Sequence, residues 1–375
     1  IGGTETKEMY YTVANDGQGR FINYQGDTPE LNYAIVRKVY VVSKGLQEPT
    51  DSGWSAPAAL QPDNNDDLED CITLMQNYMN KLNDRPSYTF MVTYDEVSTT
   101  PLIDEYTGST AAYGLRKLRA AYGGDCLQVR RGNSQTTQTI GFTAQGDLDT
   151  AALETFANGE SVFVVTWYDQ TGNNNHCIQT ATASQPKICD AGTTITLNGL
   201  PAMELDGSND SLTTAAPFNA NVNVNELIVA WVGSVDSVTT GNNTVSHWNS
   251  SQANQVFQVQ MQASGNARGA HRYSNGTISF ADSATDNVVD NQYILVMHTK
   301  KNKNELYRNG TKYNGTSVNV NPNDHSTSFR IGARSDNQAT PHGGMTQEVV
   351  VWSRSTAADD ADDISNTINQ HFSAY

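Results

Sequence analysis

The fold is best indicated by a stretch near the C-terminal end, Tyr293–Gly310, which reads YILVMHTKKNKNELYRNG. It begins with a β-rich run, Tyr293–Thr299, and ends on an Asn-Gly pair at Asn309. Asn-Gly favours a tight hairpin turn, because both residues tolerate a positive φ angle. The stretch therefore predicts a strand followed by a hairpin turn.

Similar runs follow one another over most of the chain. They are short, rich in strand-forming residues and bounded by turn residues: Val162–Trp167, Glu226–Val232, Gln255–Gln262, Tyr293–Thr299, Ser328–Gly332 and Glu348–Trp352. Further Asn-Gly pairs lie at Asn198, Asn275 and Asn314. Many short strands joined by such turns predict an antiparallel β-sandwich, which we place at residues 101–375.

Helices are predicted at three places in this region. Thr110–Tyr122 is followed by a Gly-Gly stop, and Asp149–Ala157 has Asp149 as its N-cap. Near the C-terminus, an acidic stretch leads into a helix with an apolar stripe at Ile364, Ile368 and Phe372.

Residues 1–100 are predicted to form a separate, small α+β domain. Alternating segments at Met9–Val13, Ala34–Val42 and Tyr88–Tyr94 predict strands, and the apolar spacing of Leu68–Leu82 predicts a helix. Because this region shows no catalytic motif, we expect it to attach the protein to a partner or to a neighbouring subunit.

Composition excludes several partners. The 375 residues carry a formal net charge of -17, which repels a phosphate backbone, so nucleic acid is not expected. No apolar run is long enough to predict a membrane span. The four cysteines form no C-x-x-C pair; Cys177 and Cys189 either meet across a hairpin or are buried thiols.

Three segments of the sandwich region resemble the catalytic domain of arabinofuranosidase B. They are Ala111–Leu118 (AAYGLRKL), Leu127–Gly132 (LQVRRG) and Trp167–Asn173 (WYDQTGN), the last being similar to that family's Y-D-Q-S-G-N segment. The resemblance implies a concanavalin-like or laminin-G-like jelly roll. Domains of this kind also occur on the virion surface of tailed phages.

The resemblance also implies where catalytic carboxylates belong. The family's nucleophile is a Glu on a strand reading V-D-M-E-N, and our placement of that strand at Val259–Ala263 puts Gln262 at its position. The acid/base Asp follows an I-G-G-D motif, for which Asp336 after Ile331 is the candidate. A vicinal Cys-Cys pair is absent. We therefore expect no cleavage of arabinofuranosides, with Gln262 and Asp336 as vestigial positions.

Other residues are candidates for binding. Trp248, set among polar residues, could stack on a sugar, with Asp336 and Asp169 as polar ligand-binding candidates, although Asp169 also suits a structural turn. Asp206 and Asp210 either bind Ca²⁺ or form an Asx turn. No other metal or cofactor is expected.

Three functions are consistent with these features. The first is a non-catalytic virion structural or adhesive protein, such as a phage fibre, spike or head decoration. It would be a homo-oligomer that contacts other virion or surface proteins through residues 1–100 and a cell-surface glycan through the sandwich. The alternatives are a secreted carbohydrate-binding protein and an arabinofuranosidase-type glycoside hydrolase. All three place the protein on a virion surface or outside the cell.

Overall fold

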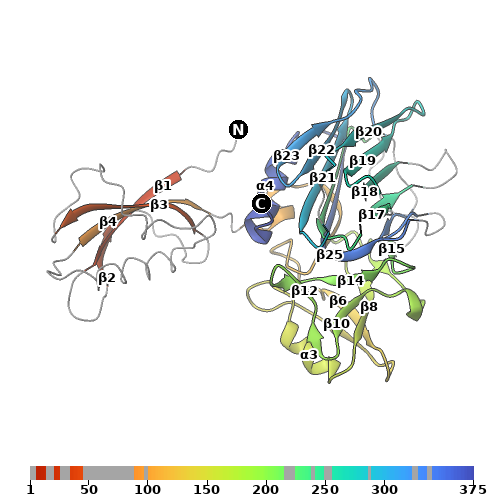
Figure 1. The fold of residues 1–375 in the computed structure, drawn as a ribbon, viewed down its shortest axis with the longest axis horizontal. Helices are drawn as coiled ribbons and strands as arrows, with labels where there is room; N and C mark the ends of the chain where they lie inside the picture. The colour runs from red at the N-terminus through yellow and green to blue at the C-terminus, as the bar shows by residue number, and fades with distance from the viewer. Residues whose placement is uncertain are drawn as a thin grey trace. The chain divides into compact units, whose positions relative to one another are not determined.

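The chain divides into two compact units, Ile1–Thr99 and Thr100–Tyr375, seen in a computed structural model (Figure 1). In the first unit the structure describes the backbone of four strands. In the second it describes all residues except 215–223, 238–240, 249–255, 286–288, 323–327 and 336–339. No helix among the described residues has the length and apolar character needed to span a membrane.

The described part of the first unit is a four-stranded antiparallel sheet in the order β2-β1-β4-β3. Its strands are β1 (Thr6–Val13), β2 (Phe21–Gln25), β3 (Ala34–Lys44) and β4 (Tyr88–Glu96). The three strands expected from alternating residues correspond to β1, β3 and β4. The expected helix Leu68–Leu82 lies outside the described residues, and the attachment role of residues 1–100 stays a prediction.

The second unit is built almost entirely of antiparallel strands, which confirms the predicted fold class. The strands are β5 (Ser109–Gly114), β6 (Leu127–Arg131), β7 (Thr137–Ile140), β8 (Val162–Trp167), β9 (Cys177–Ile178), β10 (Lys187–Asp190), β11 (Thr193–Thr194), β12 (Thr196–Leu197), β13 (Leu200–Pro201), β14 (Met203–Asp206), β15 (Leu212–Thr214), β16 (Glu226–Gly233), β17 (Asn242–His247), β18 (Phe257–Met261), β19 (Ala267–Arg272), β20 (Ile278–Asp282), β21 (Tyr293–Lys300), β22 (Lys303–Arg308), β23 (Thr311–Asn314), β24 (Arg330–Ile331) and β25 (Gly343–Arg354). The helices are α2 (Leu102–Glu105), α3 (Thr150–Ala157), the 3₁₀ helix η2 (Thr182–Ser184) and α4 (Ala361–Phe372).

Strand β16 lies at the centre of the sandwich, between β21 and β25. Its side chains alternate between two apolar clusters, as the two-residue period of a strand requires. Leu227, Val229 and Trp231 enter the main core, whereas Ile228 and Ala230 face the second cluster. The strand is therefore buried on both faces, which explains its continuous apolar sequence.

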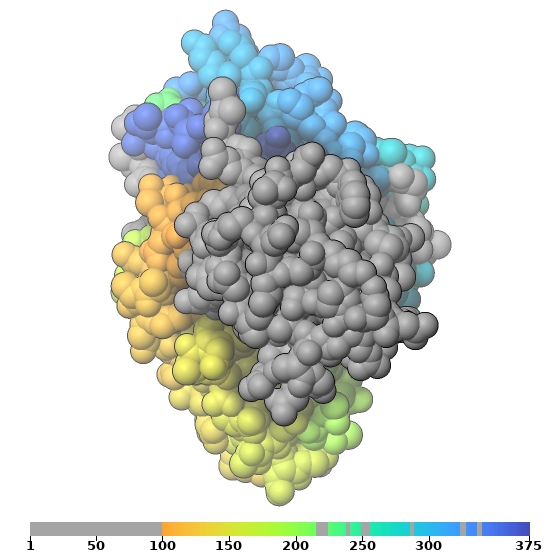
Figure 2. All heavy atoms as spheres, turned by 90° about the vertical axis from the view of Figure 1, so that its left-hand side faces the viewer, coloured from red at the N-terminus to blue at the C-terminus, as the bar shows by residue number. Residues whose placement is uncertain are grey.

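Helix α4 covers the second cluster. Its stripe of Ile364, Ile368 and Phe372 is buried there, as the spacing predicts. The two ends of the unit meet beside it, because the Tyr106 and Thr367 hydroxyls lie 2.9 Å apart. Figure 2 shows the orange first segment of this unit next to the blue C-terminal residues.

One predicted helix is wrong. Thr110–Tyr122 contains strand β5 rather than a helix, and β5 pairs with β25, for example Ala112 with Val350. Alanine, leucine and arginine favour a helix in isolation, but burial of β5 against a long central strand overrides that weak preference.

The other short helix is confirmed. α3 begins after Asp149, whose carboxylate accepts the Ala152 backbone N–H at 2.9 Å. Of the two alternatives for Cys177 and Cys189, the structure has the second: both are free, buried thiols.

Candidate functional site

Gln262, expected at the nucleophile position, lies in the tight turn between β18 and β19. Its backbone N–H donates to the Asn266 carbonyl at 2.8 Å, and its own carbonyl accepts the Gly265 N–H at 3.0 Å. The family motif places the nucleophile on a strand, whereas Gln262 directly follows β18. The assignment of Gln262 to the nucleophile position stays a prediction.

Trp248 directly follows β17, next to the opposite end of β18. Its N–H donates to the Ser335 hydroxyl at 2.8 Å, and that hydroxyl donates to the Trp248 carbonyl at 2.9 Å. Ser335 directly precedes Asp336, which lies outside the described residues. The structure thus brings Trp248 to the segment that carries Asp336. Trp248 is level with Val256, six residues before Gln262, so at about 3.3 Å per residue Gln262 is roughly 20 Å away.

Asp210 lies beside the start of that segment, because β15 pairs with β24. Gly332 packs so closely on it that a Cβ there would lie 3.0 Å from the Asp210 carbonyl oxygen. Burial, together with the nearby charge of Asp206, raises the pKa of Asp210 to about 7. A carboxyl that keeps its proton near neutral pH can act as a general acid.

Asp206 organises the turn that holds Asp210. Its Oδ1 accepts the backbone N–H groups of Ser208, Asn209 and Asp210 at 2.8, 3.1 and 3.3 Å. In return, Asp210 Oδ2 accepts the Asp206 N–H at 3.1 Å. These contacts form an Asx turn, one of the two alternatives for this loop. Calcium binding here stays a prediction.

Asp169 stabilises the fold through hydrogen bonds to the backbone. The carboxylate is almost fully buried and accepts hydrogen bonds from the backbone N–H groups of Ala112, Thr171 and Asn175 at 2.9, 3.0 and 3.1 Å. It also accepts the Thr171 hydroxyl at 2.7 Å. These bonds link β5 to the loop after β8, so Asp169 stabilises this turn rather than facing a ligand.

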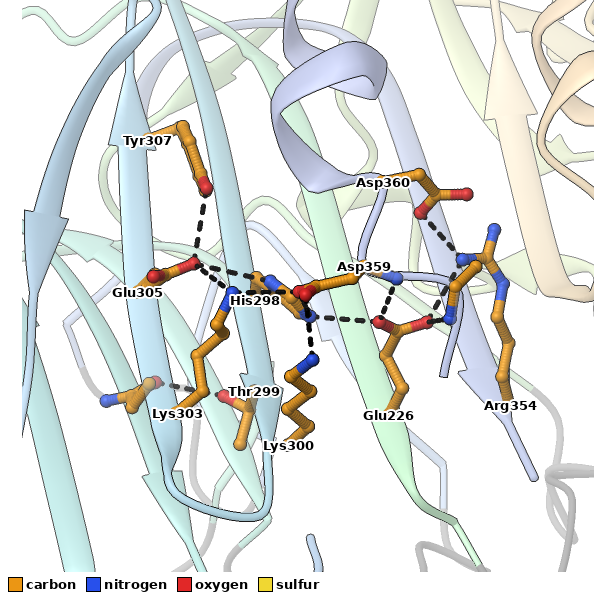
Figure 3. A network of polar contacts seen from close by, with 12 residues as sticks. Glu226, His298, Thr299, Lys300, Lys303, Glu305, Tyr307, Arg354, Asp359 and Asp360 are labelled. Carbon is orange, nitrogen blue, oxygen red and sulfur yellow. Dashed lines mark hydrogen bonds and ion pairs between the residues drawn. The ribbon is translucent and has the colours of Figure 1, made fainter. Parts of the chain in front are cut away.

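A larger polar cluster, not foreseen from the sequence, crosses β16, β21, β22 and β25 (Figure 3). Ligand-type atoms of Glu226, His298 and Asp359 lie within 4.8 Å of one another, an arrangement that could hold a metal ion. However, Lys300 and Lys303 already bind Asp359 at 2.9 and 2.8 Å. The positive charges of these side chains take the place that a cation would need, so this cluster is structural.

The charges in this cluster are stabilised mutually. Burial opposes ionisation of Glu226, but hydrogen bonds from His298 and from the Ala358 and Asp359 backbone lower its pKa to about 2. Burial likewise opposes a charged His298, yet Glu226 and Glu305 raise its pKa above the usual value. The sequence gives no sign of this cluster, because its members lie far apart along the chain.

The model of the family "Alpha-L-arabinofuranosidase B, catalytic" matches residues 103–290, just over half of the chain. Alpha-L-arabinofuranosidase B of Aspergillus kawachii is 31% identical over 117 residues, which cover 28% of this chain and 22% of the relative. The Aspergillus niger enzyme of the same name is 33% identical over 85 residues, or 22% of this chain and 16% of the relative. The matched region thus spans about a fifth of the length of these curated relatives.

Solved structures agree on the fold. A crystal structure of an arabinofuranosidase complexed with arabinofuranosyl-α-1,2-xylobiose superposes with a TM-score of 0.51 at 16% identity. The match covers 71% of this chain and 64% of that one. A mutant GH54 α-L-arabinofuranosidase soaked with 4-nitrophenyl α-L-arabinofuranoside has a TM-score of 0.50 at 15% identity, with the same coverage.

These matches correct the first functional interpretation. The prediction of a non-catalytic virion structural or adhesive protein is wrong, because the family model describes a catalytic domain and the relatives named above are arabinofuranosidases. That prediction depended on the amide at Gln262, which lies in the turn after β18.

Proposed function

Because the chain belongs to the family of the arabinofuranosidase B catalytic domain, we propose that it is a glycoside hydrolase that removes α-L-arabinofuranosyl groups from carbohydrates. The single observation that carries this proposal is the family match over residues 103–290. Since such substrates are extracellular polysaccharides and their fragments, we also propose that the protein acts outside the cell.

Hydrolysis with retention needs two carboxyl groups, one protonated and one ionised, about 5–5.5 Å apart. We assign the proton donor to Asp210, whose pKa of about 7 keeps a useful protonated fraction near neutrality. We assign the second, ionised carboxylate to Asp336, which follows Gly332 by four residues in the sequence. This differs from the acid/base role that the resemblance implies for Asp336, because Asp210 is the carboxyl that retains its proton. Gly332, at the start of the segment that leads to Asp336, packs on the backbone carbonyl of Asp210.

Trp248 would provide an apolar surface for the sugar at this edge. Its backbone is bound to Ser335, the residue before Asp336. Sugars pack their C–H faces on aromatic rings while neighbouring polar groups bind the hydroxyls. A Trp at this edge therefore suits an arabinofuranosyl group.

The test is turnover of 4-nitrophenyl α-L-arabinofuranoside by the purified chain and by Asp336→Asn. We expect release of 4-nitrophenol by the unmodified chain and a loss of at least about 100-fold in the variant, the usual effect of removing an acid, base or nucleophile. Full activity of Asp336→Asn would refute the assigned role of this residue.

A second function, carbohydrate binding without cleavage, is favoured by one observation. The sequence has no Asp or Glu between Ser237 and Phe280, the region to which the family's nucleophile motif was aligned. Binding of the same arabinofuranoside without any release of 4-nitrophenol would support this second function and reject the hydrolase.

A further inference from the structure

A hollow of about 530 Å³ opens beside β6 and β8. Its walls come from four separate turns and from two strand residues, and they are formed by Arg130, Gly132, Asn133, Gln135, Gly159, Glu160, Ser161, Phe163, Thr182, Ala183 and Ala191. The volume lies within the range of about 300–1,000 Å³ that is typical of ligand sites. None of these residues has a part in the reaction proposed above.

Arg130 gives this hollow a buried positive charge. The side chain is only 7% exposed, and its guanidinium lies over the Phe163 ring, 5.0 Å from the centroid. Among the described residues no carboxylate forms an ion pair with it. Its hydrogen-bond acceptors are neutral: Gln185 Oε1 at 2.8 Å and the carbonyls of Arg131, Thr182 and Gly132 at 3.0, 3.4 and 3.5 Å.

This arrangement leaves one N–H of Arg130 without a protein acceptor. A guanidinium carries five N–H donors; those of Nε and Nη1 have acceptors, and Nη2 makes a single long contact, to Thr182. A buried cation without a carboxylate is unfavourable unless polar groups satisfy it. A ligand oxygen would accept the remaining Nη2 N–H.

Glu160 offers the complementary acceptor. Its Oε2 accepts the backbone N–H groups of Asn133 and Ser134 at 2.8 and 3.0 Å, while Oε1 lies 3.8 Å from Arg131, beyond hydrogen-bonding distance. Oε1 can therefore accept a hydrogen bond from a ligand hydroxyl. Hydrogen bonds from Ser134 and Asn133 hold the pKa of Glu160 below its usual value, so it stays ionised.

The three groups together match the surface of a sugar. Hydroxyls both donate and accept, which suits Glu160 and Arg130, and a sugar ring has apolar C–H faces, which suit Phe163. An anionic ligand is disfavoured by Glu160 in the wall and by the net charge of -17. The ligand should therefore be neutral.

We propose that this hollow is a binding site for a neutral oligosaccharide, distinct from the carboxyls Asp210 and Asp336. Helix η2 separates the two places: Thr182 lines the hollow, and the Ser184 carbonyl accepts the backbone N–H of Ser211, next to Asp210. A glycan held in the hollow would thus lie near the edge that carries Asp210. Binding here does not require that the protein cleave arabinofuranosides.

The test uses xylotriose and cellotriose, which contain no arabinofuranosyl group, so its outcome is independent of the hydrolase assay. Affinity is measured by calorimetry on the full chain and on Arg130→Gln and Glu160→Gln. Arg268→Gln is the matched control, because Arg268 is bound to Asp282 on another strand pair and does not line the hollow.

We expect at least one trisaccharide to bind, with affinity falling about tenfold or more in Glu160→Gln and Arg130→Gln and unchanged in Arg268→Gln. Each variant is first checked for a native circular dichroism spectrum. If Arg130→Gln does not fold, the affinity of Glu160→Gln alone tests the proposal, because Glu160 lies in a turn. The proposal would be overturned if neither trisaccharide binds. It would also be overturned if Glu160→Gln binds with the same affinity as the unmodified chain.

Discussion

Glu226 and His298 form a hydrogen bond of 3.0 Å between neighbouring strands, with both side chains almost completely buried. Arg354 adds a contact to the same carboxylate at 3.1 Å and links it to Asp360 at 2.7 Å. On the other side, His298 Nδ1 lies 3.5 Å from Glu305. These charges connect the central strands to the segment that leads into α4 (Figure 3).

Removing the charge of Glu226 should destabilise the sandwich. Glu226→Gln leaves His298 and Arg354 buried without their shared carboxylate, and breaking a buried ion pair costs about 3–5 kcal/mol. Urea unfolding should show a loss of about 3 kcal/mol in the free energy of unfolding. Asp147→Asn, which changes an exposed carboxylate, should alter it by less than about 0.5 kcal/mol. Equal stability of the two variants would contradict a structural role for this cluster.

The same cluster predicts how stability depends on pH. The raised pKa of His298 gives stability that is complete below its unfolded value, about 6.5, and is lost as pH rises through the folded value. The pKa values of Glu226 and Glu305, lowered to about 2, give stability that is present above about 4.3 and is lost as pH falls towards 2.

The contribution of the cluster should therefore be greatest between about pH 4.5 and 6.5. The measurement is the free energy of unfolding from pH 3 to 9 for the unmodified chain and His298→Gln. Their difference should shrink at both ends of the range. A difference independent of pH would show that His298 is not charged in the folded protein.

Gly332 should tolerate no side chain. Its φ is +91°, and an added Cβ would lie 2.3 Å from the Leu205 side chain and 3.0 Å from the Asp210 carbonyl. Gly332→Ala should cost about 2 kcal/mol or more from strain and overpacking. Gly159→Ala is the matched control, because Gly159 has φ of +82° but nothing within 4 Å of a Cβ. If Gly332→Ala and Gly159→Ala lose the same free energy of unfolding in urea, crowding at Gly332 does not contribute to the loss.

The proton of Asp210 should set the alkaline limit of activity. Because the acid must be protonated, turnover should fall as pH rises through about 7. Asp206→Asn keeps an acceptor for the Asx turn but removes the charge that raises the pKa of Asp210, so the fall should move to lower pH. The pH profile of kcat/KM measures this shift. If kcat/KM of Asp206→Asn falls at the same pH as that of the unmodified chain, Asp210 is not the acid.

Much of the fold follows from local sequence patterns. β8 has the predicted bounds, Val162–Trp167, and β16, β21 and α4 were found because apolar runs and stripes mark elements with buried faces. β5 was not, because its alanines and the following Leu115 also suit a helix, and only the pairing of β5 with β25 determines that it is a strand.

The candidate site was less accessible to sequence reasoning. Trp248 and Ser335 lie 87 residues apart, and Glu226 and His298 lie 72 apart, so no spacing rule could bring them together. Asp210 appeared only as a turn residue or a calcium ligand, because the burial that raises its pKa depends on neighbouring strands. Gln262 was predicted from a short motif, of which Val259–Met261 lie on β18 and Gln262 begins the following turn.

The central claim is tested most directly by kcat/KM for 4-nitrophenyl α-L-arabinofuranoside, measured on the unmodified chain, Asp210→Asn and Asp147→Asn. If the chain is a hydrolase with Asp210 as proton donor, the unmodified protein and Asp147→Asn will release 4-nitrophenol at equal rates. Asp210→Asn will be slower by about 100-fold or more. No release by the unmodified chain, or equal rates for all three proteins, would contradict the account.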